Sequence, residues 1–263
     1  MDGDRNFDDL AERFGRNIYG TTKGRLRLTL VRDALARMLA RLPPDRPLRI
    51  LDAGCGPGHL AAWLAQQGHT LLLCDHSAKM LTETRERLAD HADRCTFLHA
   101  PLQALCEEEH GRFDLILLHA VLEWVAEPRT VLAHLRSLLV PGGRLSLLFY
   151  NRDALIWRHL LRGNFRKIER GDFAGHPRSL TPTHPRDPRE VKHWLRELGL
   201  RVHEPCGIRV IHDYLDPDVR EARDFEDLLA MERRFRHREP FLWLGRYLHY
   251  DVAAESDIHA DAR

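Results

Sequence analysis

Two acidic residues bracket a glycine-rich turn in the first third of the 263-residue chain. Asp52 ends a short apolar run and precedes the sequence GCGPG at residues 54–58, and Asp75 lies 21 residues beyond Gly54. Alternating glycines after a buried strand let the backbone turn sharply and let a ligand approach it closely. An acidic residue at the end of the next strand is suited to accept hydrogen bonds from both hydroxyl groups of a ribose. The spacing predicts a nucleoside-binding site.

The Asp52 carboxylate distinguishes this loop from a loop that binds a dinucleotide. A pyrophosphate commonly binds at G-x-G-x-x-G, against a helix N-terminus, whereas His59 replaces the last glycine of that pattern here. A carboxylate at residue 52 would repel a pyrophosphate and attract a cation such as an amino group. The pattern argues against a nicotinamide-dependent oxidoreductase, and a non-catalytic nucleoside-binding module remains an alternative.

The elements that must hold these residues alternate between strands and helices from residue 48. Short apolar runs predict strands at residues 48–51, 70–74, 95–98, 113–118 and 144–150. Apolar spacings near 3.6 residues predict helices at residues 60–67, 77–88 and 131–139. Such alternation predicts a parallel sheet covered on both faces, whose ligands bind at the carboxyl ends of the strands. Asp52 and Asp75 both lie at such ends.

The alternation ends after residue 150, because glycines and prolines are frequent up to residue 190 and no periodicity is visible there. Just before this point, the turn sequence Pro-Gly-Gly at residues 141–143 leads into the fifth strand. Later patterns predict helices at 188–198 and 225–235 and strands at 201–204, 208–212 and 246–254. We therefore expect one α/β domain with an insertion after strand five.

Composition excludes several classes of protein. Hydrophobic residues form 43% of the chain and charged residues 30%, which is enough apolar material for a core and excludes disorder as the main state. The 5 cysteines include no C-x-x-C pair and no H-E-x-x-H sequence occurs, so we expect neither a disulfide framework nor a metal site. The longest uncharged run, residues 53–74, is interrupted by glycines and does not suit a membrane span. An acidic start without an apolar stretch favours a cytoplasmic location.

The net charge of +1 conceals an uneven distribution. Residues 1–150 are neutral overall, residues 151–212 carry 6 more basic than acidic side chains, and residues 213–263 carry 5 more acidic than basic ones. A basic segment with interleaved aromatic residues suits phosphate binding. The alternative is that the acidic C-terminal segment simply pairs with it.

The glycine loop and Asp75 resemble motif I of class I S-adenosylmethionine-dependent methyltransferases, and the resemblance covers about residues 48–150. It implies a Rossmann-like, mostly parallel seven-stranded sheet with helices on both faces, and S-adenosyl-L-methionine as the cofactor. Within a single domain of residues 1–263 we expect a helical segment that covers the cofactor (1–47), a cofactor-binding core (48–150), a basic substrate-side insertion (151–212) and a C-terminal helix with the closing strand (213–263). The cofactor-binding residues that the resemblance implies are Arg27, Asp52, Gly54, Cys55, Gly56, Asp75, His76, Met80, Leu102, Gln103 and His119.

Further segments resemble a narrower group of bacterial methyltransferases, which esterify the carboxylate of 5-carboxymethoxyuridine at the tRNA wobble position. These segments lie at residues 5–9, 17–24, 119–125, 147–151, 163–165, 185–188, 209–215 and 244–247. The resemblance implies a methyl ester product and the tRNA anticodon stem-loop as the partner. One departure, CGP at residues 55–57 in place of that group's Gly-Gly-Glu, is common among class I methyltransferases. A methyltransferase of a small carboxylic acid or phenol is the alternative.

A carboxylate substrate is already ionised at neutral pH, so methyl transfer to it needs no general base and depends on alignment and desolvation. We expect His119 and Tyr150 to position the reacting groups. The candidate substrate residues, which could orient an anion, are Tyr150, Asn151, Arg186, Arg209 and His212. The sequence leaves open whether Trp124 stacks on a base or packs in the core, and whether Glu123 is structural or a base.

Overall fold

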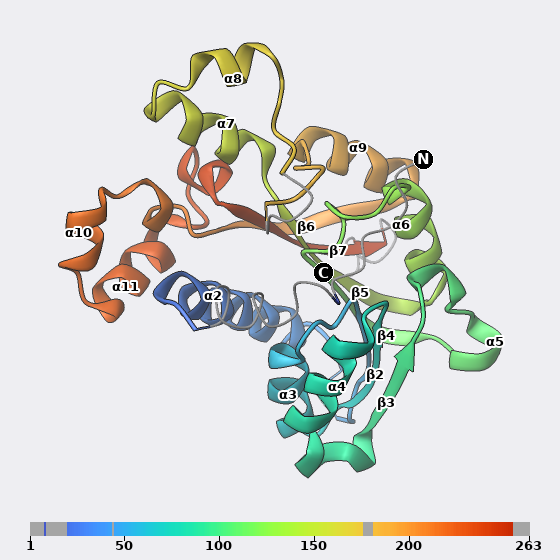
Figure 1. Ribbon diagram of the computed structural model, residues 1–263. Helices are drawn as coiled ribbons and strands as arrows, with labels where there is room; N and C mark the ends of the chain where they lie inside the picture. The colour runs from blue at the N-terminus through green and yellow to red at the C-terminus, as the bar shows by residue number, and fades with distance from the viewer. Residues whose placement is uncertain (1–7, 9–19, 44, 176–180, 255–263) are drawn as a thin grey trace, which may run out of the picture.

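Seven strands form one sheet, in the order β3-β2-β1-β4-β5-β7-β6, at the centre of the computed structural model, which describes residues 8, 20–43, 45–175 and 181–254 (Figure 1). The strands are β1 Arg49–Ala53, β2 Thr70–Asp75, β3 Cys95–His99, β4 Phe113–His119, β5 Leu139–Tyr150, β6 Leu200–Ile208 and β7 Tyr247–Ala254. β7 runs antiparallel to β5 and β6, and the other neighbouring pairs are parallel. The predicted Rossmann-like, mostly parallel seven-stranded sheet is confirmed.

Helices connect the strands and cover the sheet (Figure 1). The α-helices are α2 Thr22–Leu39, α3 His59–Gln66, α4 Ala78–Arg87, α5 Glu107–His110, α6 Pro128–Ser137, α7 Arg152–Leu161, α8 Phe165–Glu169, α9 Pro188–Glu197, α10 Pro217–Glu221 and α11 Phe225–Phe235. Short 3₁₀ turns are η2 Ala89–Arg94, η3 Leu102–Ala104, η4 His212–Tyr214 and η5 Phe241–Leu244. None of the helices in these described ranges has the length and apolar composition needed to cross a membrane.

Successive side chains of a strand point to opposite faces of the sheet, so the apolar residues of the central strands are divided between two cores, one on each face. In β4, Leu115 and Leu117 pack with residues of α2, α3 and α4, whereas Ile116 and Leu118 pack with residues of α6 and α9. All four side chains are fully buried. Strands that are buried on both faces have continuous apolar sequences, which is why this strand could be predicted.

The region after β5 differs most from expectation. Residues 151–170 form α7 and α8 where no periodicity is visible in the sequence. The strand expected at 201–204 lies within β6, whereas the strand expected at 208–212 is wrong, since β6 ends at Ile208. Arg209 then adopts a φ of +62° and turns the chain out of the sheet. The turn expected at 141–143 lies within β5.

Glu232, on α11, holds the turn that follows β6. Its fully buried carboxylate accepts hydrogen bonds from the backbone N–H groups of Val210, Ile211 and His212 at 2.6, 3.1 and 2.9 Å. These bonds satisfy backbone N–H groups that a further strand would pair with its neighbour in the sheet. The sequence pattern does not predict them, because Glu232 lies about twenty residues further along the chain.

α11 is also bound to α2. Arg233 Nε lies 2.8 Å from Asp33 Oδ2, and Arg236 Nη1 donates to the backbone oxygen of Leu30 at 2.7 Å. One helix therefore supports both the turn after β6 and the helix that precedes β1. The segments at 5–9 and 17–24 are described only in part, since residues 5–7, 9 and 17–19 lie outside the described residues.

Candidate functional site

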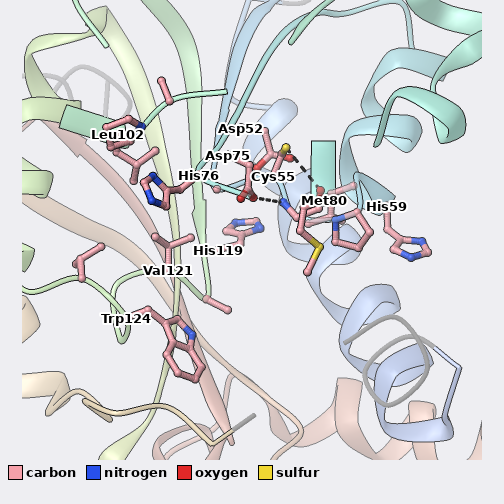
Figure 2. Close-up of a pocket in the computed structure, with 18 of the residues that line it drawn as sticks. Asp52, Cys55, His59, Asp75, His76, Met80, Leu102, His119, Val121 and Trp124 are labelled. Atoms are coloured by element: carbon pink, nitrogen blue, oxygen red, sulfur yellow. Dashed lines mark hydrogen bonds between the residues drawn. The ribbon is translucent and has the colours of Figure 1, made fainter. Parts of the chain in front are cut away.

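A pocket of about 1040 Å³, counted with its open mouth, lies at the carboxyl ends of β1, β2 and β4 (Figure 2). This volume suits a cofactor-sized ligand. Ten of the eleven residues that the sequence assigns to the cofactor line it: Arg27, Asp52, Gly54, Cys55, Gly56, Asp75, His76, Met80, Leu102 and His119. Gln103 is not part of the lining. Adjacent residues of a helical turn point in different directions. The turn η3 therefore directs the side chain of Leu102 into the pocket but not that of Gln103.

The Asp75 carboxylate lies between the walls of the pocket, with Met80 on one side and His76 on the other (Figure 2). Its Oδ2 accepts a hydrogen bond from the N–H of Gly56 and its Oδ1 from the N–H of Ser77, both at 2.8 Å. Each carboxylate oxygen has a second lone pair. The two backbone bonds therefore fix the carboxylate and leave it able to accept from two hydroxyl groups.

Asp52 gives the pocket a second, deeper carboxyl group. It is only 4% exposed, and burial together with the nearby Asp75 raises its pKa to about 7. Burial also raises the pKa of Asp75. Each carboxyl group makes ionisation of the other less favourable, and a cation placed between them would reverse this effect. This end of the pocket therefore suits a positively charged ligand group.

Gly54 brings the first loop close to the loop after β4. Its φ is +81°, and a Cβ at this position would lie 2.4 Å from Val121 Cγ2. A Cβ at Gly56 would meet nothing within 4 Å. The alternating glycines thus allow one close backbone approach and leave open space beside it.

His119 ends β4 and belongs to a buried row of polar groups that crosses the sheet. Its Nε2 lies 2.7 Å from Ser146 Oγ, which lies 2.7 Å from His249 Nε2. Burial and the nearby Arg27 lower the pKa of His119 to about 3, and burial and His119 lower the pKa of His249. Both imidazoles are neutral at physiological pH, so His119 adds no positive charge to the pocket.

A row of aromatic rings and guanidinium groups leads from the pocket to the end of β5. Arg27 Cζ lies 4.7 Å from the ring centroid of Tyr247, which packs edge-on against Tyr150 at 5.3 Å. Arg246 Cζ lies 4.6 Å from the Tyr150 centroid. Burial raises the pKa of Tyr150 to about 12, so its hydroxyl stays protonated and able to donate.

At the end of β5, around Tyr150, basic side chains outnumber the acidic side chains beside them. Arg209 Nε lies 2.8 Å from Asp213 Oδ2, and this guanidinium overcomes the effect of burial and holds the pKa of Asp213 well below its usual range. Arg158 and Arg246 form no ion pair within the described ranges, and Arg158 Nε and Arg246 Nη1 are buried there without a hydrogen-bond partner. Burial and Arg246 lower the pKa of Arg158. We call Tyr150, Arg158, Arg209 and Arg246 the cationic site.

Three of the five candidate substrate residues lie at or beside the cationic site, because Tyr150 and Arg209 belong to it and His212 Nδ1 lies 3.9 Å from Asp213 Oδ2. Asn151 is instead fully buried beneath it, where its Nδ2 donates to the backbone oxygens of Trp243 and Gly245 at 2.7 and 2.9 Å. Its Oδ1 caps α7. The structure therefore gives Asn151 a supporting role, and its contact with substrate stays a prediction.

Arg186 holds the loop that follows β4. Its Nε and Nη2 donate to the backbone oxygen of Leu122 at 2.9 and 2.6 Å, and Nη2 also donates to that of Val125 at 3.0 Å. This loop carries Trp124 and Val125 into the pocket lining. Arg186 thus shapes a wall of the pocket, and a direct contact with substrate stays a prediction.

Glu123 lies in the same loop but is not among the pocket-lining residues. It is fully buried, and burial raises its pKa to about 7 against the opposing effects of nearby backbone amides and Arg27. A carboxyl group without access to the pocket cannot take a proton from a ligand there. The geometry therefore favours the structural role for Glu123, whereas Trp124 faces the pocket.

Several residues of the site are missing from the sequence-based assignment. Arg246 lies in a segment that resembles other methyltransferases, but only the pairing of β5 with β7 brings it beside Tyr150. The additional lining residues are Pro57, His59, Leu60, Ala100, Pro101, Ala120, Val121, Trp124 and Val125. Within the part of the chain that the structure describes, no group of three or more His, Cys, Asp or Glu could hold a metal ion.

Two solved structures resemble this fold. Magnesium protoporphyrin IX methyltransferase from Synechocystis PCC 6803, with bound SAM, is 21% identical and gives a TM-score of 0.55 over 76% of this chain and 85% of that one. A chain of the complex between the Haloferax volcanii Trm112 methyltransferase activator and the putative methyltransferase is 18% identical and gives a TM-score of 0.59 over 95% of this chain and 98% of that one. At these identities the likeness concerns the fold alone.

Sequence comparison is more specific. The family described as "Methyltransferase domain" matches residues 51–145. The tRNA 5-carboxymethoxyuridine methyltransferase of Escherichia coli strain K12 is 45% identical over 248 residues, which cover 94% of this chain and 95% of that protein. Because this identity extends over nearly the full length of both chains, the protein belongs to the family of tRNA 5-carboxymethoxyuridine methyltransferases.

Proposed function

We propose that this chain transfers the methyl group of S-adenosyl-L-methionine to the carboxylate of 5-carboxymethoxyuridine at the wobble position of the tRNA anticodon stem-loop, forming the methyl ester. The observation that carries the proposal is the cationic site. Its Arg158 and Arg246 each have a buried nitrogen without a hydrogen-bond partner among the described residues. An anionic nucleoside supplies the acceptors that these donors lack, whereas an uncharged one leaves them unpaired.

The pocket residues suit the cofactor group by group. Asp75 would accept hydrogen bonds from the ribose hydroxyls, Asp52 would attract the amino group, and Arg27 would hold the carboxylate of the methionine part. When bound, S-adenosylmethionine supplies an electrophilic methyl group on a sulfonium. The neutral imidazole of His119 suits a site that must accept such a cation.

The chain's own residues align the substrate carboxylate that receives the methyl group and remove water from around it. The substrate carboxylate is ionised at neutral pH, so no residue has to remove a proton from it. Tyr150 donates through its hydroxyl, and Arg158 and Arg246 supply fixed positive charge that replaces water around the anion. Because these groups are already held in place by packing, little reorganisation is needed when the substrate arrives.

Two tRNA preparations test the proposed function. The protein is incubated with labelled S-adenosylmethionine and tRNA that carries either 5-carboxymethoxyuridine or unmodified uridine at the wobble position, and the nucleosides are then analysed by mass spectrometry. We expect the methyl ester from the first tRNA and no labelled nucleoside from the second. Equal labelling of both tRNAs, or methylation of small carboxylic acids with neither tRNA labelled, would contradict the proposal.

Asp75→Ala should weaken S-adenosylmethionine binding by about 1–3 kcal/mol, or about 5- to 150-fold, because two hydroxyl groups lose their acceptor. Calorimetric titration of the cofactor measures the change. Ser77→Ala is the matched control, since it removes the side-chain cap of α4 and leaves the carboxylate in place. Equal losses in both variants would show that Asp75 acts only by supporting the loop and helix.

Cofactor affinity should rise with pH, because the pKa of Asp52 is raised to about 7 and its ionised form favours a cation. Between pH 5.5 and 7 the ionised fraction grows about 10- to 20-fold, and the association constant should follow it. Asp52→Asn should bind more weakly and lose this dependence, while any titration of the cofactor itself remains in both proteins. A parallel pH profile for the two proteins would exclude Asp52 as the linked group.

The same pKa affects folding in the opposite direction. The folded protein retains a proton on Asp52 that the unfolded chain has already released above about pH 4. The contribution of Asp52 to the free energy of unfolding therefore falls as pH rises from about 4 to 7. Thermal unfolding of the cofactor-free protein should show this fall, and Asp52→Asn should reduce it.

A further inference from the structure

Exposed apolar side chains gather at α7 and α8. Trp157, Leu160, Leu161 and Phe165 are 39%, 41%, 57% and 59% exposed. They are four of the seven large apolar residues with such exposure in the described part of the chain. Figure 1 shows α7 and α8 projecting beyond the sheet, away from α3 and α4. A concentration of exposed apolar groups marks an interaction surface.

Positive charge surrounds these apolar side chains. Arg162 and Arg170 directly follow α7 and α8, and Arg166 and Lys167 lie on α8. None of the four pairs with an acid among the residues that the structure describes. Besides burial, nearby cations that include Lys167 and Arg162 lower the pKa of His159. An apolar surface with unbalanced positive charge matches a partner that is both aromatic and anionic.

α7 connects this surface to the cationic site. Its inner face buries Ala154 and Leu155 and carries Arg158 toward Tyr150, whereas its outer face exposes Trp157 and Leu161. The helix has 10 residues, so it spans about 15 Å. A nucleotide held at the cationic site therefore has its neighbours along the strand within reach of the outer face.

We infer that α7 and α8 form the docking surface for the tRNA anticodon loop. Bases next to the wobble nucleotide stack on Trp157 and Phe165, and phosphates contact Arg162, Arg166, Lys167 and Arg170. The inference rests on the proposed function, which supplies the RNA. Exposed aromatic rings bind unpaired bases without regard to sequence, and arginine and lysine bind the backbone phosphates.

Two multiple variants separate stacking from charge. One combines Trp157→Ala with Phe165→Ala, and the other replaces the four cations Arg162, Arg166, Lys167 and Arg170 by alanine. Matched controls replace exposed residues elsewhere: Met231→Ala with Phe241→Ala, which are 42% and 40% exposed, and Arg136→Ala with Arg196→Ala. Direct binding of tRNA is measured over a range of salt concentrations, together with the dissociation constant of S-adenosylmethionine.

We expect each surface variant to bind tRNA at least tenfold more weakly, with unchanged cofactor affinity and unchanged binding in the controls. The slope of log K against log salt should become shallower by about 3 in the four-cation variant, as expected for four lost contacts to a single strand, and should stay the same in the stacking variant. Turnover at saturating tRNA should remain close to that of the parent protein.

The outcomes distinguish this surface from the proposed function. Parental tRNA affinity in both surface variants would overturn the docking surface, even if the parent protein methylates tRNA. Weaker binding in the variants, with no methylation by the parent protein, would support the docking surface and contradict the proposed function. Variant-sensitive binding to anionic lipid vesicles without any binding to tRNA would assign the surface to a membrane and overturn RNA docking.

Discussion

Arg246→Met should lower kcat/KM for tRNA that carries 5-carboxymethoxyuridine by about 30- to 1000-fold and leave the affinity for S-adenosylmethionine unchanged. Arg246 is 7% exposed, and its Nη1 has no hydrogen-bond partner in the described part of the chain. Removing one member of a buried, hydrogen-bonded charge pair costs about 2–4 kcal/mol, which corresponds to this loss of rate. Steady-state kinetics with both substrates varied measure the effect.

The thermal stability of Arg246→Met shows whether Arg246 serves to bind an anion or to hold the folded structure together. Burial and, after it, Arg246 lower the pKa of Arg158, so the two charges repel each other in the ligand-free protein. Arg246 also attracts Asp213 and helps to lower its pKa, so Arg246→Met removes an attraction together with this repulsion and should leave the melting temperature nearly unchanged, although activity falls. Arg233→Met is the matched control, because it removes a half-exposed guanidinium that pairs with Asp33 on α2. A lower melting temperature with full activity in Arg246→Met would exclude Arg246 from the substrate site.

Gly54→Ala should nearly abolish cofactor binding and lower the free energy of unfolding by about 2–5 kcal/mol. The φ of +81° costs an alanine about 1–2 kcal/mol, and its Cβ would lie 2.4 Å from Val121 Cγ2. To avoid this close contact, either the glycine loop at residues 54–58 or Val121 must move, and both contribute to the lining of the pocket. Denaturant unfolding and cofactor titration measure the two effects.

Gly142→Ala separates backbone strain from the steric contact. Gly142 has a φ of +77°, and a Cβ there would meet nothing within 4 Å. This variant should lose only about 1–2 kcal/mol of stability and bind the cofactor normally. The double variant Gly54→Ala with Val121→Ala should recover part of the lost affinity, because the contact disappears and the strain remains. Without such recovery, the contact with Val121 is not the cause.

The cofactor pocket could be predicted because its residues follow local rules. Asp52 and Asp75 end apolar strands, and the carboxyl ends of neighbouring parallel strands lie at one edge of a sheet. The alternating glycines between them indicate a close backbone approach. These signals lie within about thirty residues of one another, so no long-range pairing had to be known.

The cationic site could not be predicted in the same way. Arg158 lies on α7, which directly follows β5, but Arg246 precedes β7 and meets Tyr150 only because β7 pairs antiparallel with β5. Apolar periodicity indicates that a strand exists but not which strand it joins. Arg186 shows the converse, since its position suggested an anion ligand and its guanidinium instead binds backbone oxygens of the loop at residues 122–125.

The attachment of α11 to both α2 and the turn after β6 has a consequence for cooperativity. Glu232 holds the turn beside Arg209, and Arg233 and Arg236 hold the helix that carries Arg27 into the pocket. A ligand that immobilises α2 also restricts the fluctuations of α11 and of the turn that it holds, so less conformational entropy remains to be lost when tRNA binds beside that turn. Thermodynamic linkage is reciprocal, so cofactor and tRNA should raise each other's affinity by the same factor.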